Sequence, residues 1–432
     1  MKRRRSRSQN RINRNRSWGH RRRSFGVGTV ILIILCTISS IGLLYTGLNL
    51  FHVFDPPEET TIVLESTPAP TEPPTEPPTE PPTPEERLEM IWANDTRTPV
   101  EARGIYITGP VAGTVNTLNG LIDLVDRTEL NAVVIDVKND SGEITYTMSE
   151  ETVQEIGAVT RYVADMPGLV QRLKEKNIYV IARVVAFKDP ILAEQKPEFS
   201  LKKTDGSTFR DKDGLAWVNP FHHGVWEYLV NVSKQAIAIG FDEIQFDYIR
   251  FSTDSGMADV NFGPEAEGLS KIDAITGFVK YACEELVPLG AFVSADVYGT
   301  IINNPTDGKI VGQDYQKMAK YLDYICPMIY PSHYYDGVYG IDHPDMDPYT
   351  LILRSMQDSE ALLAEVAEDG HVAKARAWLQ DFTATWLANH ITYGPDQIRA
   401  QINGVYDSGS PQEWILWNGS NRYTEGGLLP QQ

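Results

Sequence analysis

The segment Gly240–Phe251 carries the side chains with the clearest chemical potential. It reads Gly-Phe-Asp-Glu-Ile-Gln-Phe-Asp-Tyr-Ile-Arg-Phe, and as a strand it would alternate its side chains between two faces. Gln245 and Asp247 share the face that we expect to point into the centre of the protein. The opposite face, which we expect to meet helices, carries Ile244, Phe246 and Tyr248. Because burying an isolated carboxylate is costly, we predict that Asp247 lies at a cleft near the end of the strand, as a catalytic group.

The segment Phe292–Tyr298 repeats this arrangement with a second carboxylate. Its alternation puts Ser294, Asp296 and Tyr298 on one face. Two carboxylates on adjacent strands can lie about 5 Å apart, the separation that a retaining glycosidase requires between nucleophile and acid/base. We therefore predict Asp247 as the nucleophile and Asp296 as the acid/base. Transition-state stabilisation and a purely structural hydrogen bond are the alternative roles for Asp296.

Charged side chains on two further candidate strands face the same way. Asp136 and Lys138 share one face of Ala132–Lys138, and Arg183 points inward from Ile178–Phe187. One interpretation is that these charges orient sugar hydroxyls and tune the catalytic carboxylates. The other is a buried ion network that satisfies itself, including a salt bridge from Arg183 or Lys138 to the predicted nucleophile. Both interpretations stay open at this point.

Aromatic and hydrogen-bonding side chains occur at several predicted strand ends. Rings in such places suit stacking on sugar faces, although they also serve ordinary packing. Besides Asp136, Lys138 and Arg183, the predicted substrate-binding residues are Gln245, Tyr298, Tyr330, His333, Trp378, Gln380 and Trp417.

The motifs of other chemistries are missing from the sequence. It has neither the clustered His and Cys of a zinc site nor a Gly-x-Ser-x-Gly nucleophile elbow, and it has no P-loop. His222 and His223 are adjacent, and no His-Glu-x-x-His pattern surrounds them. We therefore expect no metal and no cofactor.

Short runs rich in Val, Ile, Tyr and Phe must position these residues, and they alternate with longer amphipathic stretches. The predicted strands are Gly104–Thr108, Ala132–Lys138, Ile178–Phe187, Glu243–Phe251, Ala291–Tyr298, Tyr324–Tyr330, Arg376–Phe382 and Trp414–Asn418. Predicted helices between them include Thr117–Thr128, Met166–Lys176, Gly224–Ile239, Asp273–Leu286 and Tyr315–Leu322. Eight such units predict an α/β fold, a (β/α)8 TIM barrel, whose active site is built at the C-terminal ends of the strands. A doubly wound sheet is the alternative, but no glycine-rich nucleotide turn follows the first strand.

The 432-residue chain has a strongly basic N-terminal part and an acidic remainder. Residues 1–54 hold 11 Lys and Arg and no acid, and this leaves 28 bases against 58 acids, or −30, for the rest of a chain with net charge −19. The acidic part disfavours nucleic acid as a ligand. Residues 25–54 carry no charged side chain and exceed the roughly 20 residues that span a bilayer.

These patterns predict four parts of the chain. They are a basic cytoplasmic arm at 1–24, a transmembrane signal anchor at 25–54, a disordered Pro/Thr/Glu-rich linker at 55–98 and the barrel at 99–425. Basic residues before the apolar run predict a single-pass protein of the cell membrane, with a cytoplasmic N-terminus and an extracellular C-terminal domain. A cleaved signal peptide is the alternative.

Several blocks, taken in order, resemble one bacterial family. They are Arg103-Gly-Ile-Tyr-Ile, Asn131-Ala-Val-Val-Ile-Asp-Val-Lys, Tyr179-Val-Ile-Ala-Arg-Val-Val, Gln245-Phe-Asp-Tyr-Ile-Arg-Phe, Ser294-Ala-Asp-Val-Tyr-Gly, Pro327-Met-Ile-Tyr-Pro-Ser-His-Tyr and Trp378-Leu-Gln-Asp-Phe. The family is a domain of unknown function described as putative glycosyl hydrolase and related to the alpha-amylase clan of barrels. The resemblance covers roughly residues 100–420, and it implies a TIM barrel that acts on a carbohydrate.

The resemblance also carries over to single residues. The clan's nucleophile is an Asp at the end of strand four, which Asp247 matches. Its acid/base is a Glu after strand five, where this sequence offers Asp296 instead. The clan has a further Asp after strand seven; Asp381 is close, but alternation points it outward while Gln380 faces in.

The sequence therefore predicts a membrane-anchored extracellular glycoside hydrolase that acts on a poly- or oligosaccharide through a carboxylate pair. One alternative is a catalytically inactive TIM barrel that binds carbohydrate of the cell envelope, which the missing strand-five Glu favours. A scaffold whose Pro-rich stalk recruits partners is the other.

Overall fold

The computed structural model describes residues 82–431 of the chain. The predicted basic arm at 1–24, the predicted transmembrane segment at 25–54 and most of the predicted linker at 55–98 lie outside these residues. Within residues 82–431, none of the helices combines the length and the apolar character needed to cross a bilayer.

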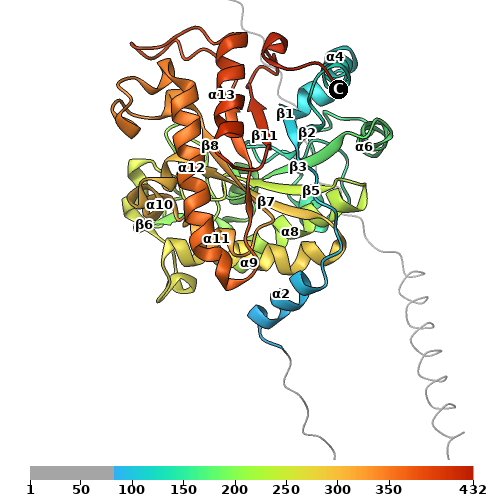
Figure 1. The fold of residues 1–432 in the computed structure, drawn as a ribbon. Coiled ribbons are helices and arrows are strands. Elements are labelled where there is room, and N and C mark those ends of the chain that lie inside the picture. The colour runs from blue at the N-terminus through green and yellow to red at the C-terminus, as the bar shows by residue number, and fades with distance from the viewer. Residues whose placement is uncertain (1–81, 432) are drawn as a thin grey trace, which may run out of the picture. The chain divides into compact units, whose positions relative to one another are not determined.

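Eight parallel strands close into a barrel (Figure 1). Neighbouring strands pair in the order β10-β11-β1-β2-β3-β5-β7-β8, and pairing of β8 with β10 closes the ring. The strands are β1 Arg103–Ile107, β2 Ala132–Lys138, β3 Tyr179–Val185, β5 Glu243–Asp247, β7 Phe292–Tyr298, β8 Tyr324–Ile329, β10 Ala377–Gln380 and β11 Trp414–Trp417. The predicted (β/α)8 barrel is confirmed, and each strand falls within or within one residue of a predicted run.

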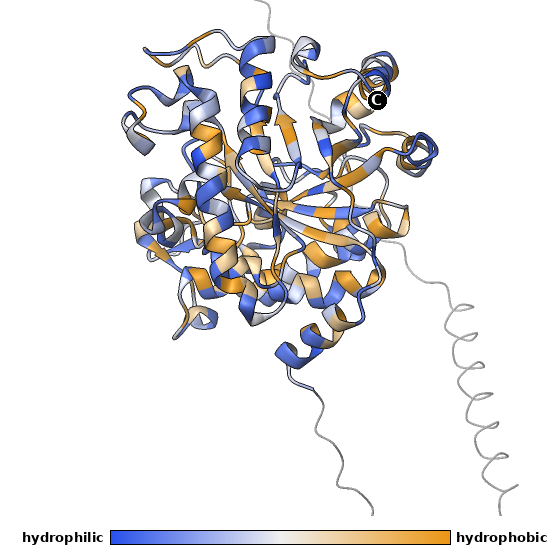
Figure 2. Ribbon diagram, in the orientation of Figure 1, coloured by the Kyte–Doolittle hydropathy of each residue, from blue (hydrophilic) through white to orange (hydrophobic). Residues whose placement is uncertain are grey.

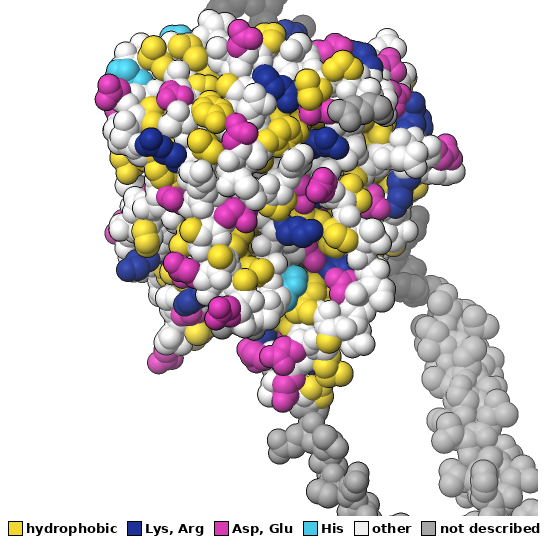
Figure 3. All heavy atoms as spheres, viewed as in Figure 1, with side chains coloured by type: hydrophobic (Ala, Val, Ile, Leu, Met, Phe, Trp, Pro, Cys, Tyr) yellow, Lys and Arg dark blue, Asp and Glu magenta, His cyan; other side chains and the backbone are white. Residues whose placement is uncertain are grey.

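Helices surround the barrel because every barrel strand except β11 is followed by at least one α-helix before the next barrel strand. The longer ones are α4 Val115–Arg127, α6 Met166–Glu175, α8 His223–Ala238, α9 Lys271–Leu286, α12 Pro348–Val366 and α13 Pro395–Asp407. Short helices, α3 Gly109–Ala112, α5 Glu151–Glu155, α7 Pro190–Gln195, α10 Pro305–Val311 and α11 Tyr315–Ala319, lie between them in the chain. Figure 2 shows largely hydrophobic strands inside helices whose outer sides are hydrophilic. Figure 3 shows acidic and basic side chains interspersed over one face of the molecule.

The strands bury side chains on both faces, as parallel barrel strands must. The outward face packs against the helices and forms the larger apolar cluster, which includes Ile244 and Phe246. A smaller cluster fills the barrel and includes Tyr179, Phe292 and Tyr324. The strand alternation predicted for Ile244 and Phe246 is therefore confirmed.

A buried ion network occupies the N-terminal half of the barrel interior. Arg376 is fully buried, and its Nη1 lies 2.8 and 2.9 Å from the two carboxylate oxygens of Glu243. Its Nε donates to Glu413 at 2.8 Å, and its guanidinium lies 3.7 Å from the centre of the Tyr324 ring. Ser294, predicted to point inward, donates to Glu243 at 2.5 Å. These contacts satisfy charges that a barrel core would otherwise exclude.

A helix replaces part of the predicted disordered linker. Pro84–Ala93 forms α2, which begins with a capping box between Thr83 and Glu86. Leu88 of α2 is buried, and Glu85 pairs with Lys280 of α9. The prediction of disorder up to residue 98 is therefore wrong for this stretch, because a helix start signal follows directly on the Pro-rich repeat.

Arg97, in the segment after α2, binds residues at the N-terminal end of the barrel. Its guanidinium lies 2.6 Å from Asp323 and 2.8 Å from Asp95, and it stacks 4.3 Å from the centre of the Phe292 ring. Burial raises the pKa of Asp323 to about 6, although Arg97 opposes this shift.

Candidate active site

A cavity of about 890 Å³ opens at the C-terminal ends of the barrel strands. Such a position is where active sites occur in this architecture. Eight of the twelve predicted site residues line the cavity: Arg183, Asp247, Asp296, Tyr298, Tyr330, His333, Trp378 and Trp417. The loops after the strands add Thr108, Asp140, Arg250, Asp307 and Tyr335.

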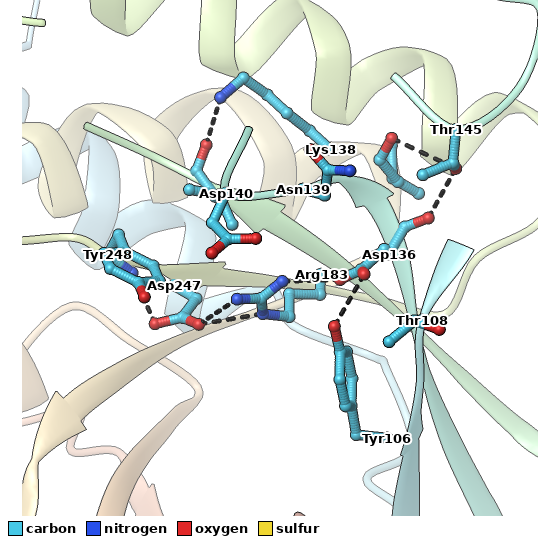
Figure 4. A network of polar contacts seen from close by, with 12 residues as sticks. Tyr106, Thr108, Asp136, Lys138, Asn139, Asp140, Thr145, Arg183, Asp247 and Tyr248 are labelled. Atoms are coloured by element: carbon cyan, nitrogen blue, oxygen red, sulfur yellow. Dashed lines mark hydrogen bonds and ion pairs between the residues drawn. The ribbon is translucent and has the colours of Figure 1, made fainter. Parts of the chain in front are cut away.

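Asp247 is the last residue of β5 and is held by a cation from β3 (Figure 4). Nε and Nη2 of Arg183 lie 2.9 and 2.5 Å from Oδ2 of Asp247. The backbone N–H of Tyr248 donates to the other oxygen at 2.6 Å. The predicted salt bridge to Arg183 is therefore present, and it fixes the carboxylate while the residue still lines the cavity.

Arg183 also ties Asp247 to a deeper carboxylate. Its Nη1 donates to Asp136 at 2.6 Å, and the hydroxyl of Tyr106 donates to the other oxygen of Asp136 at 2.7 Å. Asp136 is 3% exposed and is not among the cavity residues. Burial raises the pKa of Asp136, and Arg183 opposes the rise. Asp136 thus matches the buried-network interpretation, whereas Arg183 both completes the network and faces the cavity.

Asp296 lies beside Asp247 on the next strand. β5 and β7 pair from Glu243↔Phe292 through Phe246↔Ala295, so one further step of this register brings Asp247 level with Asp296. Nε1–H of Trp378 donates to Oδ1 of Asp296 at 2.6 Å. Burial, and then the negative charge of Asp247, raise the pKa of Asp296 well above its usual value. Burial and the neighbouring charge therefore favour the protonated form of Asp296, which lies next to a carboxylate that is paired with a guanidinium.

Aromatic rings surround this carboxylate pair. Tyr330 lies 5.7 Å from Trp417 between ring centres, and Trp378 lies 6.4 Å from Tyr106. Burial raises the pKa of Tyr330, so its hydroxyl stays protonated. The rings offer stacking surfaces next to two acids, an arrangement suited to a sugar.

Lys138 does not lie where the alternation predicts. A register shift between Asp136 and Lys138 interrupts the pairing of β2 with β3. Lys138 is fully buried, and its Nζ contacts Asp189 at 2.9 Å, the carbonyl of Val185 at 2.7 Å and the ring of Tyr228 on α8 at 6.0 Å. The predicted substrate contact is therefore wrong in this structure, because the irregularity turns the side chain toward the helix layer.

Gln245 and Gln380 point inward as predicted but do not reach the cavity. Both are fully buried. The amide of Gln245 donates to Sγ of Cys326 at 3.4 Å. Gln380 bonds Ser332 and Asp345 and thereby fixes two loops beside the strand end. Their expected contacts with substrate are replaced by contacts within the protein.

Asp381, directly after β10, is bonded to the segment that follows β11. Its carboxylate accepts hydrogen bonds from the backbone and hydroxyl of Thr424, at 2.8 and 2.7 Å. It does not line the cavity.

Tyr248 does not continue the alternation of the strand. The sequence analysis placed it on the helix-facing side, whereas the structure places it in the cavity. The strand ends at Asp247, and Tyr248 adopts a positive φ of 48°, a conformation that costs energy in a residue with a side chain. The turn puts Tyr248 and Arg250 among the cavity residues. The sequence around Tyr248 does not indicate a positive φ, because the prediction from strand alternation assumes an extended backbone.

Asp140 is a further cavity residue without a predicted role. It follows β2, and its carboxylate lies 3.7 Å from Nζ of Lys188. Its position two residues beyond a strand end was the signal available in the sequence. Within residues 82–431, no group of three or more His, Cys, Asp and Glu side chains is arranged to hold a metal ion.

The fold and the cavity together define a TIM barrel with an acidic, ring-lined site at its C-terminal face. Residues 104–423 match the family model described as "Putative glycosyl hydrolase domain", so the chain belongs to this family. Membership of this family supports a glycoside hydrolase-like function. Comparison with curated protein sequences gives no match.

The chain is also similar to several solved structures, and the first of these shares its fold. The PgaB (BpsB) glycoside hydrolase domain from Bordetella bronchiseptica is 15% identical, with a TM-score of 0.54, over 74% of this chain and 94% of that domain. A hypothetical protein from Ruminiclostridium thermocellum is 39% identical over 45% of this chain and 97% of its own, with a TM-score of 0.42. An alpha-galactosidase from Thermus thermophilus is 13% identical over 79% of this chain and 63% of its own, with a TM-score of 0.45.

Proposed function

We propose that the barrel hydrolyses O-glycosidic bonds of a poly- or oligosaccharide, with Asp247 as nucleophile and Asp296 as acid/base. The observation that carries this proposal is the pairing of two level carboxyl groups in opposite environments. One is paired with the guanidinium of Arg183, and the other is buried with a raised pKa. Environments that separate two carboxyl groups in this way are the usual basis for assigning acid and base roles.

The reaction proceeds in two displacements. Asp296 donates its proton to the oxygen of the leaving sugar while a carboxylate oxygen of Asp247 forms a bond to the anomeric carbon. Asp296, now ionised, takes a proton from water, and the water oxygen displaces Asp247 from that carbon. Neighbouring strands lie about 4.8 Å apart, which favours the short carboxyl separation of retaining enzymes. We therefore expect the product to keep the anomeric configuration, which NMR of the first product can determine.

Replacement of the two acids tests these roles. Asp247→Asn is expected to lower kcat on any hydrolysed glycan by at least about 10⁴-fold, while an Asn oxygen still accepts a hydrogen bond from Arg183. Asp381→Asn is the matched control, since Asp381 is bonded outside the cavity. A mechanism-based fluoroglycoside should label Asp247, and peptide mapping locates the label. Turnover by Asp247→Asn equal to that of the parent would exclude Asp247 as the nucleophile.

A catalytically silent glycan-binding barrel is the second candidate. It is favoured by the hydrogen bonds to both oxygens of Asp247 and by an Asp where the related clan has a Glu. A broad glycan panel separates the candidates. Binding without product release, in a folded protein, would favour the silent barrel.

The proposal includes a place for the barrel outside the cell membrane. It rests on the uncharged run at 25–54, the basic residues before it and the Thr-Glu-Pro repeat that follows. The expected result is that the protein resists carbonate extraction from membranes and that protease added to intact cells removes the barrel. Release by carbonate, or protection from protease, would contradict this topology.

A further inference from the structure

Two arginines line the cavity, and they differ in their partners. Arg183 is paired with Asp136 and Asp247. Arg250 lines the same cavity, but no carboxylate within residues 82–431 forms an ion pair with it. Among the residues that the structure describes, its one hydrogen bond to protein runs from Nη1 to the carbonyl of Phe251 at 2.9 Å. A half-buried guanidinium with five N–H donors is therefore left with most of its donors available.

Three aromatic rings hold this guanidinium in place. Its central carbon lies 5.2 Å from the centre of the Trp217 ring, 5.0 Å from that of Tyr248 and 4.8 Å from that of Tyr298. In a cation–π contact the cation lies over the face of an aromatic ring, and the contact needs no hydrogen bond from the cation's N–H groups. The edge of the guanidinium carries the N–H fork, which matches planar carboxylates and phosphate-type oxyanions in geometry. The rings thus surround Arg250 without accepting conventional hydrogen bonds from it, and the bond to Phe251 uses only one of its N–H groups.

The two tyrosines place Arg250 next to the reacting groups. Tyr248 directly follows Asp247, and Figure 4 shows the two side by side. Tyr298 lies two residues after Asp296 on the same strand. Arg250 and the two carboxyl groups therefore line one cavity, so that a sugar bound there can present a substituent to Arg250.

From this arrangement we infer that Arg250 binds an oxyanion substituent of the glycan, so that the substrate is an acidic rather than a neutral polysaccharide. The inference rests on the proposed function, because that function places a sugar in the cavity. The shared chemistry is a carboxylate, sulfate or phosphate group attached to a sugar. Loss of this group would leave a desolvated guanidinium without its partner, so a neutral glycan of the same shape is bound more weakly.

A glycan array tests the inference without interference from turnover. The full-length Asp247→Asn protein, kept in a detergent without a sugar headgroup, is applied to neutral, uronate-containing, sulfated and phosphorylated glycans. We expect at least tenfold tighter binding to one acidic class than to its neutral counterparts. The class that binds identifies the source of the oxyanion. Equal binding of acidic and neutral glycans, or binding of none, would overturn the inference whatever the variants do.

Variants in the same background assign the effect to Arg250. Arg250→Met should abolish the preference, and Arg250→Lys should retain part of it because it keeps the charge but lacks the fork. Arg161→Met is the matched control, since Arg161 is exposed and outside the cavity. A preference that survives in a folded Arg250→Met protein overturns the inference.

Turnover by the protein with an intact Asp247 separates this inference from the proposed function. Hydrolysis of neutral glycans with kcat/KM unchanged by Arg250→Met would overturn the inference and leave the hydrolase. Binding that prefers acidic glycans and depends on Arg250, without any turnover, would support the inference and contradict the proposed hydrolase function.

Discussion

Asp247 and Asp296 lie level on neighbouring barrel strands, but their carboxyl groups meet different donors. Asp247 accepts two hydrogen bonds from the guanidinium of Arg183, whereas Asp296 accepts one from the neutral indole of Trp378. The guanidinium holds the carboxylate of Asp247 in place, whereas burial and a neighbouring negative charge raise the pKa of Asp296. This difference, more than the presence of two acids, is what divides their proposed roles.

The raised pKa of Asp296 predicts the alkaline side of the pH–activity profile. The acid role requires protonated Asp296, so kcat/KM should fall as the pH rises through this pKa. In Asp296→Asn the remaining activity should lose that dependence and should be highest on aryl glycosides, whose leaving groups need no proton. A pH profile measured with natural and aryl substrates tests both points. An unchanged alkaline limb in the variant would rule out Asp296 as its source.

The substitution Trp378→Phe should move the alkaline limb of the pH–activity profile to higher pH. Burial and Asp247 raise the pKa of Asp296, and the hydrogen bond from Trp378 opposes them. Phe keeps an aromatic ring but removes the donor, so the pKa rises further and the alkaline limb moves to higher pH. The shift is measured as the change in the midpoint of kcat/KM against pH. A shift to lower pH would contradict the assigned direction.

Arg376→Met should destabilise the barrel strongly. It would leave Glu243 and Glu413 buried without their cation, and breaking such a network costs about 3–5 kcal/mol of unfolding free energy. Denaturant titration measures the loss. Arg354→Met is the control, because Arg354 is exposed outside this network. A loss no larger than that of the control would show that the network contributes little.

The raised pKa of Asp323 predicts that the free energy of unfolding depends on pH between about pH 4 and pH 6. Its pKa in the folded protein is about 6, above the usual 3.8, mainly because it is buried. A raised carboxyl pKa stabilises the fold fully below the unfolded value, and this contribution is lost as the pH rises through about 6. Across that window the parent should lose about 3 kcal/mol relative to Asp323→Asn. Unfolding titrations at several pH values measure the difference, and a difference that is constant with pH would contradict the prediction.

The positions of the strands and the faces of most of their side chains can be predicted from local sequence patterns. Runs of β-branched and aromatic residues mark the eight strands, and a period of two places Asp247, Asp296 and Arg183 inside the barrel. Both signals are local, so they need no knowledge of distant contacts. Because alternation along each strand predicts the inward face, eight of the predicted site residues do line the cavity.

Which of the inward-facing residues reach the cavity depends on how the barrel closes. Gln245 and Gln380 share the correct face but are sealed by neighbouring elements, and the shifted register of β2 turns Lys138 toward the helices. The positive φ of Tyr248 and the three rings around Arg250 depend on contacts between strands that are far apart in the chain. Alternation predicts a face, whereas depth, register and partners are set by closure of the barrel, which brings together residues that no short stretch of sequence contains.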